Sequence, residues 1–334
     1  MTHPVPLRVV LFAAAYAALV TGCGEPSRGT TGGDGPKMHR IAVIPKGTTH
    51  DFWKSIHAGA QQAADELGNV EIIWKGTPTE ADKEKQIQIV ESFVVEQVDG
   101  IVLAPIDRES LVPAVRRAKQ SGIPVVVFDS GLSDEVTPVS HVATDNHHGG
   151  VVAAERIVEL LGGKGNVILL RYQAGSESTE QRERGFLETI AKHPDIKILS
   201  EAERVGSDAN HALQISQSLL TKFGDEVDAI FTVCEPNNTG MLQALENAKL
   251  AGKVKFVGFD STPRFVRALE EEKMHGLVLQ DPVRMGYLAV KTMAAHLDGQ
   301  PVEKRISTGE FLATPENRTD PKIHELLHPV KHER

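Results

Sequence analysis

Residues 123–130 read IPVVVFDS, and this stretch decides the fold because an apolar run ends directly in an acidic residue. Such a run predicts a strand buried on both faces, as in parallel sheets covered by helices. The same ending returns at residues 254–261, which read VKFVGFDS. Each copy places an aspartate, Asp129 or Asp260, at the carboxyl end of its strand, where ligands bind in open parallel sheets.

The similarity between the two halves of the chain extends upstream of these strands. Residues 98–101 (VDGI) return as residues 227–230 (VDAI), and each is followed by a loop and a helix that ends in Ala-Lys. Because each half contains a full set of elements, the repeat predicts two copies of one domain rather than a solenoid.

Apolar strands alternate with amphipathic helices along both halves. The periodicity predicts strands at 41–44, 70–74, 100–104, 123–128, 166–170 and 196–199, and helices at 52–67, 80–97, 110–121, 178–192 and 210–223. This alternation predicts an α/β protein with two Rossmann-like, three-layer lobes built on parallel sheets.

The amino-terminal segment predicts export. Residues 7–22 form an apolar run too short to span a bilayer comfortably, and only Arg8 supplies a basic start. The run ends in VTGC at residues 20–23, which resembles a bacterial lipobox, the pattern in which the cysteine becomes the lipidated first residue. We therefore expect a lipoprotein signal peptide at 1–22, lipidation at Cys23 and a flexible tether at 23–38. The alternatives are an uncleaved membrane anchor or a cysteine that matches the pattern by coincidence.

Composition excludes several classes of function. With 334 residues, the chain is long enough for two domains, and its formal net charge of -9 argues against nucleic acid as a partner. The two cysteines, Cys23 and Cys234, provide neither a disulfide scaffold nor a thiolate metal site. The neighbouring His147 and His148 are not spaced as a helical metal pair. We predict no cofactor and no metal.

Several short stretches carry a resemblance that covers residues 39–320. These are IAV at 41–43, HDFW at 50–53, VVFD at 126–129, DN at 145–146 with GG at 149–150, Arg182 with GF at 185–186, VGFD at 257–260, and Gln280 with Pro282 and Gly286. Together they resemble the ribose-binding and related sugar-binding proteins of bacterial ABC importers, the type I periplasmic-binding-protein family.

The resemblance implies an extracytoplasmic binding protein rather than an enzyme. It implies one lobe at 39–143 plus 281–307 and another at 144–280 plus 308–330, joined by a three-segment hinge. The lobes would close over a sugar, and the closed monomer would dock on the membrane subunits of an ABC permease.

Polar candidates for ligand contact follow from the resemblance and from their chemistry. Asp129 and Asp260 would accept hydrogen bonds from hydroxyl groups, although either could instead cap a helix. Arg182 offers a planar fork of donors, or is a surface residue in the charged run 180–184. Gln280 can donate and accept, or brace the hinge.

Two adjacent aromatic residues, Phe52 and Trp53, are expected near the sugar because aromatic planes suit the apolar faces of a sugar ring. Neighbours on a helix point in different directions, so at most one of them fits the core-facing stripe. Phe52 lies on that stripe with Ile56 and Ala60, so Trp53 is the residue predicted to face the ligand more directly.

Departures from the ribose-binding pattern leave the ligand open. His50 stands where that pattern has Asn, and Cys234-Glu235 stands where Asn-Asp is expected. Lys46 resembles the ligand-contacting lysine of furanosyl autoinducer receptors, and Glu180 and Gln181 stand where those receptors carry an acid and an amide. We expect a monosaccharide, ribose-like or related, at a site that includes Lys46, His50 and Cys234.

Three alternatives remain at this point. The first is a receptor that presents a furanosyl autoinducer or a polyol to a sensor kinase or chemoreceptor. The second is a sugar-acting enzyme, which would need an acid–base pair with tuned pKa values. The third is a regulator of the lactose-repressor class, which would need a helix-turn-helix where the export segment stands.

Overall fold

The computed structural model describes residues 37–332. The predicted signal peptide, Cys23 and nearly all of the tether lie outside the described residues. Within 37–332 no helix is long and apolar enough to cross a membrane.

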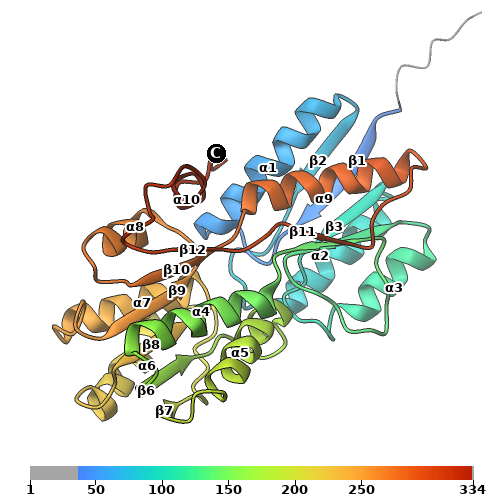
Figure 1. Cartoon of the computed structure of the whole chain (residues 1–334). Helices are drawn as coiled ribbons and strands as arrows, with labels where there is room; N and C mark the ends of the chain where they lie inside the picture. Colours follow the sequence, from blue (N-terminus) through green and yellow to red (C-terminus); the bar gives the residue numbers. More distant parts are fainter. Residues whose placement is uncertain (1–36, 333–334) are drawn as a thin grey trace, which may run out of the picture. The chain divides into compact units, whose positions relative to one another are not determined.

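Two six-stranded sheets form the framework (Figure 1). The first sheet has the order β11-β5-β4-β3-β1-β2 and the second has β12-β10-β9-β8-β6-β7. The strands of the first are β1 (His39–Ile44), β2 (Val70–Trp74), β3 (Gly100–Leu103), β4 (Val125–Phe128), β5 (His141–Ala143) and β11 (Arg305–Ser307). Those of the second are β6 (Gly165–Leu170), β7 (Ile196–Ser200), β8 (Ala229–Thr232), β9 (Lys255–Phe259), β10 (Gly276–Leu279) and β12 (Phe311–Ala313).

The two sheets match position by position, which confirms the predicted pair of Rossmann-like lobes. Equivalent strands occupy equivalent places, so β4 and β9, which carry the repeated Phe-Asp-Ser, correspond. All described pairings within the sheets are parallel except that β12 runs antiparallel to β10. The equivalent pair in the first sheet, β11 and β5, is parallel.

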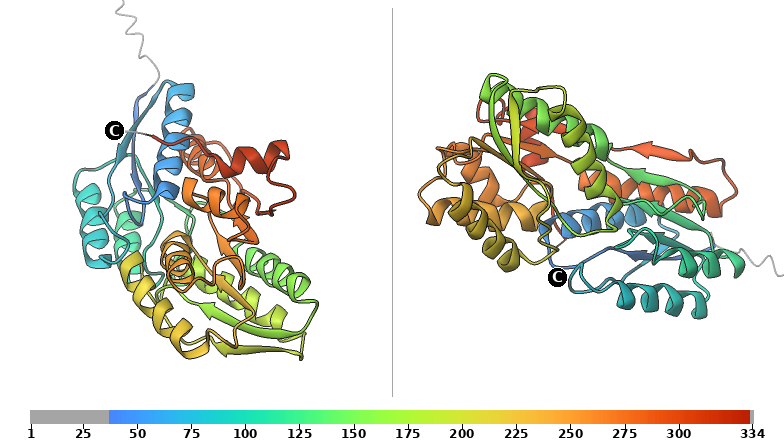
Figure 2. Two further views of the ribbon diagram at one scale, coloured as in Figure 1. Left: turned by 90° about the vertical axis from the view of Figure 1, so that its left-hand side faces the viewer. Right: turned by 90° about the horizontal axis from the view of Figure 1, so that it is seen from below.

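Helices cover both faces of each sheet (Figure 2). The first lobe contains α1 (Asp51–Leu67), α2 (Lys83–Val95), α3 (Val112–Gln120) and α9 (Pro282–Leu297). The second contains α4 (Asn146–Leu161), α5 (Glu177–Ile190), α6 (Ala209–Phe223), α7 (Glu235–Asn247), α8 (Pro263–Glu270) and α10 (Pro321–Leu327).

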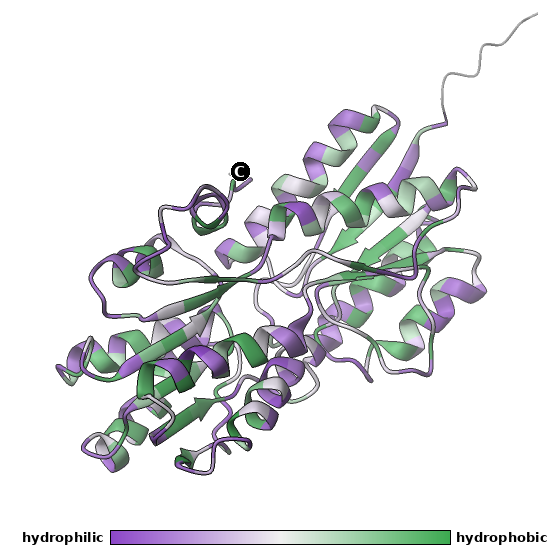
Figure 3. Cartoon of the chain, in the orientation of Figure 1, coloured by the Kyte–Doolittle hydropathy of each residue, from purple (hydrophilic) through white to green (hydrophobic). Residues whose placement is uncertain are grey.

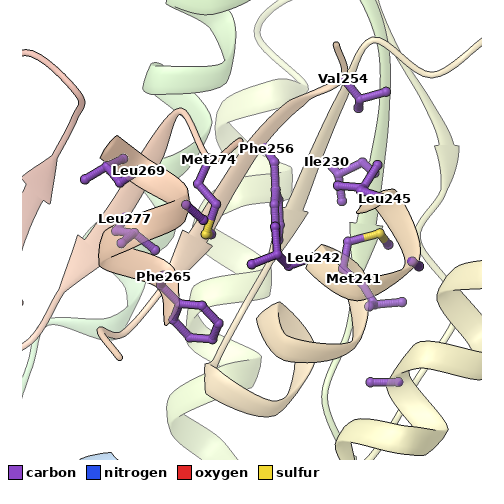
Figure 4. Packing of buried hydrophobic residues seen from close by; sticks show 14 of the residues in the cluster. Ile230, Met241, Leu242, Leu245, Val254, Phe256, Phe265, Leu269, Met274 and Leu277 are labelled. Atoms are coloured by element: carbon purple, nitrogen blue, oxygen red, sulfur yellow. The ribbon is translucent and has the colours of Figure 1, made fainter. Parts of the chain in front are cut away.

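Side-chain alternation along the buried strands divides each core into two layers. Along β9, Phe256 packs toward α7 and α8, whereas Val257 and Phe259 pack toward α4 and α5. The apolar strands and the inward stripes of the helices are visible in Figure 3, and the layer around Phe256 is shown in Figure 4. Burial on both faces explains why these strands read as continuous apolar runs.

Glycines let one pair of helices in each lobe pack closely. In the first lobe α1 contacts α9, and a Cβ added at Gly59 would lie 1.8 Å from the carbonyl oxygen of Val283. In the second lobe α4 contacts α5, and a Cβ at Gly150 would lie 2.0 Å from the carbonyl oxygen of Arg182. No side chain fits at either crossing.

The chain passes between the sheets three times, after β5, after β10 and after β11. Its carboxyl-terminal segment then returns from α10, which packs in the second lobe, to α1. There Lys331 Nζ lies 2.7 Å from Asp51 Oδ2, and the backbone N–H of His332 donates to the carbonyl of Lys54 at 3.1 Å. This segment therefore ties the second lobe to the first helix of the first lobe.

Candidate functional site

One pocket is lined by residues from both lobes. All nine residues predicted from the sequence line it: Lys46, His50, Phe52, Trp53, Asp129, Arg182, Cys234, Asp260 and Gln280. Six residues that were not predicted as contacts also line it: Glu80, Tyr172, Ser178, Thr179, Glu235 and Pro236.

Asp129 occupies the tip of β4 and is paired with Lys46. Its backbone has a φ of 60°, a left-handed conformation that Asp tolerates better than most residues. Lys46 Nζ lies 2.8 Å from Asp129 Oδ2, and both side chains are almost fully buried. The same ammonium donates to Ser176 Oγ at 3.3 Å and to Ser178 Oγ at 3.1 Å, both in the second lobe. Lys46 therefore links the two lobes at the floor of the pocket.

Asp260 occupies the equivalent tip of β9, with a φ of 73°, but its partners are different. Gln280 Nε2 donates to Asp260 Oδ1 at 2.7 Å, and the backbone N–H of Glu235 donates to Oδ2 at 3.0 Å. Burial raises the pKa of Asp260, and the charge of Arg182 and these hydrogen bonds only partly oppose the rise. The carboxylate thus caps the start of α7, while Thr262 caps α8, the helix that follows Asp260 itself.

Arg182 is buried rather than on the surface. Its Nε donates to Asn146 Oδ1 and one Nη to the carbonyl oxygen of Val233, both at 2.8 Å. The guanidinium also stacks 3.7 Å above the ring of Phe259. These contacts fix the plane of the guanidinium, so its remaining N–H groups have a defined direction at the pocket wall.

The sequence prediction for Phe52 and Trp53 was wrong in orientation. Trp53 is 2% exposed and belongs to the core cluster of the first lobe, whereas Phe52 is only partly buried. Both rings line the pocket and pack edge to face, with centroids 4.9 Å apart. The helix begins at Asp51, and its first turn faces the pocket and not the sheet alone, so an extrapolated helical stripe misassigned this turn.

Glu80 organises a cluster that the sequence did not reveal. Its Oε1 accepts hydrogen bonds from His50 Nδ1 at 2.7 Å and Trp53 Nε1 at 2.8 Å. Its Oε2 accepts from the hydroxyl of Tyr172, in the other lobe, at 2.8 Å. The predicted helix at 80–97 begins only at Lys83, which leaves Glu80 in a turn beside the pocket. No periodicity marks such a turn residue.

The pKa values of this cluster favour an ion pair. Burial alone would raise the pKa of Glu80, but His50, Lys46 and Trp53 hold it at about 2. Burial alone would lower the pKa of His50, but the bond to Glu80 and the acidic surroundings raise it to about 9. At neutral pH both groups are charged, and both oxygens of Glu80 are occupied by protein donors.

Cys234 and Glu235 lie at the amino-terminal end of α7. Cys234 is buried, burial raises the pKa of its thiol, and its Sγ lies 3.3 Å from Asn237 Oδ1. Burial also raises the pKa of Glu235 to about 7, with His50 opposing the rise and Asp260 adding to it. Glu235 Oε2 accepts a long hydrogen bond of 3.4 Å from the backbone N–H of Phe52, across the gap between lobes.

Glu180 and Gln181 do not line the pocket. Glu180 Oε1 accepts a hydrogen bond from the backbone N–H of Gly175 at 3.0 Å, and Gln181 accepts one from Arg184. Of the three residues that carried the resemblance to furanosyl autoinducer receptors, only Lys46 is at the site.

Comparison with known proteins gives one family. The family described as "Periplasmic binding protein domain" matches residues 41–301. A ribose import binding protein of Haemophilus influenzae is 32% identical over 266 residues, which are 80% of this chain and 88% of that protein.

Solved structures agree. A carbohydrate transporter solute-binding protein from Agrobacterium radiobacter, in complex with D-arabinose, has a TM-score of 0.83 and 33% identity, over 88% of this chain and 100% of that one. An ABC transporter solute-binding protein from Agrobacterium vitis, with bound D-fucose, has a TM-score of 0.83 and 31% identity, over 86% and 100%. These relatives are named as binding proteins and not as enzymes. The chain belongs to the periplasmic binding protein domain family.

Proposed function

We propose that this protein is the extracytoplasmic binding component of an ABC importer and holds a neutral monosaccharide between its lobes. The observation that carries the proposal is the convergence of Asp129 and Asp260, the tips of equivalent strands in two sheets, on one pocket. Aromatic rings, carboxylates and a fixed guanidinium are the groups that suit a ring with apolar faces and hydroxyl edges.

In this proposal the ligand uses the hydrogen-bonding capacity that the protein leaves open. Asp129 Oδ1 and Glu235 offer acceptors, and Arg182 and His50 Nε2 offer donors. Gln280 has a supporting role, because its amide is engaged by Asp260 and by the hydroxyl of Thr144 at 2.8 Å. The ring of Phe52 supplies the apolar face.

The test is a thermal-shift panel on the full chain with D-ribose, D-arabinose, D-allose, D-fucose and xylitol. A ligand that binds only the native state raises the melting temperature by mass action. Asp129→Asn, which keeps a residue suited to positive φ, should lose most of the shift that the best ligand produces. Asp225→Asn, a matched change at an exposed position, should keep it. A wild-type shift in Asp129→Asn would contradict the site.

We further propose that the lobes, 39–143 plus 281–307 and 144–280 plus 308–330, open and close about the three connections as a monomer. Contacts across the gap, such as Tyr172 with Glu80, support a closed form that ligand would favour. Small-angle scattering should show a smaller radius of gyration when the best sugar is added. An unchanged radius at saturation would argue against closure.

Anchoring through a lipid on Cys23 is part of the same proposal and is supported by the lipobox at residues 20–23. In a bacterial host, the wild-type chain should partition with membranes and Cys23→Ser should not. Equal membrane partition of both forms would remove the lipid from the proposal and leave ligand binding untouched.

A further inference from the structure

The charges that line the pocket do not balance. Three cationic side chains, Lys46, His50 and Arg182, face four acidic ones, which are Glu80, Asp129, Glu235 and Asp260. His50 counts among the cations because Glu80 keeps its ring protonated at neutral pH. Above pH 7, where Glu235 with its pKa of about 7 is ionised, the acidic side chains outnumber the cationic ones. The contacts identify which acid lacks a partner.

Three of the four acids have compensating partners. Asp129 is 2.8 Å from Lys46, and Glu80 is 2.7 Å from His50. Asp260 receives the Gln280 amide and a backbone N–H, and it lies in the field of Arg182. These three carboxylates are therefore stabilised by contacts within the protein.

Glu235 is different. Within residues 37–332, no Lys, Arg or His lies within ion-pair distance of its carboxylate, and its one side-chain hydrogen bond is the 3.4 Å contact from Phe52 N–H. His50 acts on Glu235 only through its field, because its ring is already paired with Glu80. The residue is partly buried, at the first position of α7, and its carboxylate meets α1 of the other lobe. It therefore presents acceptor oxygens to whatever occupies the pocket.

We propose that Glu235 sets the charge selectivity of the pocket: neutral sugars and amino sugars are admitted, and sugar acids are excluded. This inference rests on the proposed sugar-binding function. An ionised carboxylate only accepts hydrogen bonds, so it pairs with a hydroxyl or an ammonium group and repels a second carboxylate. Partial desolvation makes this repulsion stronger than it is in water.

The experiment compares affinities of the full chain by calorimetry at pH 8. The probes are two matched trios, D-glucose with D-glucuronate and D-glucosamine, and D-galactose with D-galacturonate and D-galactosamine. Wild-type protein should bind the neutral sugar at least about tenfold more tightly than its acid, and the amino sugar no more weakly than the neutral one. In Glu235→Gln the preference over the acid should shrink at least about fivefold.

Two further variants keep the test specific. Glu235→Asp preserves the charge and should preserve the exclusion of the acids. Glu201→Gln makes the same charge change at an exposed position outside the pocket and should leave all ratios unchanged. Melting curves without ligand establish that each variant is folded.

The outcomes separate the two proposals. If neutral sugars bind and the acid-to-neutral ratio is the same in wild type and Glu235→Gln, the selectivity role is overturned. Equal wild-type affinity for acid and neutral sugar overturns it as well. If neither neutral sugar of these trios binds while a sugar of the thermal-shift panel does, the selectivity role is overturned and the sugar-binding function stands. If no sugar of either set binds, both proposals fail.

Discussion

The two lobes share a backbone plan and differ in the groups that contact the aspartate at the equivalent strand end. Asp129 and Asp260 follow equivalent strands and both have positive φ. The charge of the first is balanced by a buried ammonium at 2.8 Å, whereas the second only accepts hydrogen bonds from an amide and a backbone N–H. The comparison shows that the position of a residue in the sheet determines where its carboxylate lies. The neighbouring side chains determine the free-energy cost of burying that carboxylate in its ionised form.

The residues that follow the first strand of each lobe show the same divergence. Lys46 follows β1 and Tyr172 follows β6, each two positions beyond the strand. Each reaches into the opposite lobe, Lys46 to serine hydroxyls and Tyr172 to Glu80. Both lobes therefore place a residue that contacts the opposite lobe at the same position after the strand, but the residue is cationic in the first lobe and uncharged in the second.

The largest expected effect comes from breaking the ion pair of the first lobe. Lys46→Met leaves Asp129 buried without a counter-charge, which should cost about 3–5 kcal/mol of unfolding free energy. Denaturant unfolding measures the loss, and Lys46→Met combined with Asp129→Asn should recover most of it. A loss below about 1 kcal/mol in the single variant would show that the contact between Lys46 and Asp129 contributes little to stability.

The close helix pairs should respond alike in the two lobes. Alanine in place of glycine inside a helix gains about 1 kcal/mol from propensity. At Gly59 and Gly150 the new Cβ would instead meet a backbone oxygen at 1.8 Å and 2.0 Å. Each substitution should therefore destabilise the protein by about 1–3 kcal/mol net. If one variant is neutral and the other is not, the crossings are not equivalent.

The ion pair between His50 and Glu80 should make stability depend on pH. The pKa of His50 is raised in the folded state from 6.5 to about 9, so its contribution is complete below about pH 6.5 and is lost as pH rises through 9. His50→Gln keeps a donor near Glu80 but removes the charge. Its deficit should be on the order of 1–2 kcal/mol at pH 6 and should vanish by about pH 10.

The control for the pH dependence of His50→Gln is a substitution of its ion-pair partner, Glu80. The pKa of Glu80 is lowered to about 2, so its contribution is present above about pH 4.5 and is lost as pH falls through 2. Glu80→Gln should therefore converge with wild type at the acidic end. A deficit of His50→Gln that does not change between pH 6 and pH 10 would show that packing, and not charge, is responsible.

The smallest effect is expected at Asp260. Because burial raises its pKa, its ionised form is disfavoured in the folded state, in contrast to an acid with a buried ion pair. The asparagine introduced by Asp260→Asn also tolerates the positive φ at this position. We expect its unfolding free energy to stay within about 1 kcal/mol of wild type. A loss as large as that of Lys46→Met would show that both tips depend on their charge.

Much of the fold could be predicted from the internal repeat, and much of the site from the repeat together with the resemblance to known binding proteins. The repeated FDS at 128–130 and 259–261 fixed two strands, and strand ends in a parallel sheet converge on a ligand edge. All nine candidate residues line the pocket, but only Asp129, Asp260 and Gln280 directly follow such strands. The resemblance to known binding proteins supplied the others.

The parts that sequence reasoning missed depend on three-dimensional packing. Glu80 lies in a turn that joins no periodic pattern, and it acts only through partners such as Tyr172 that are distant in sequence. The exchange of roles between Phe52 and Trp53 arises because the first turn of α1 meets Glu80 and Phe128 at once. Helical periodicity describes one contact face and cannot represent a residue that meets two.

The buried thiol of Cys234 provides a native site for measuring access to the pocket. It lines the pocket at 8% exposure and is the one free cysteine of the part of the chain that the structure describes. Burial raises its pKa, so we expect the thiol to stay protonated and to react slowly in the arrangement of this structure. If the lobes open and close as proposed, the rate at which a maleimide labels Cys234 would report how often they open. The measurement would need neither an introduced labelling site nor the identity of the ligand.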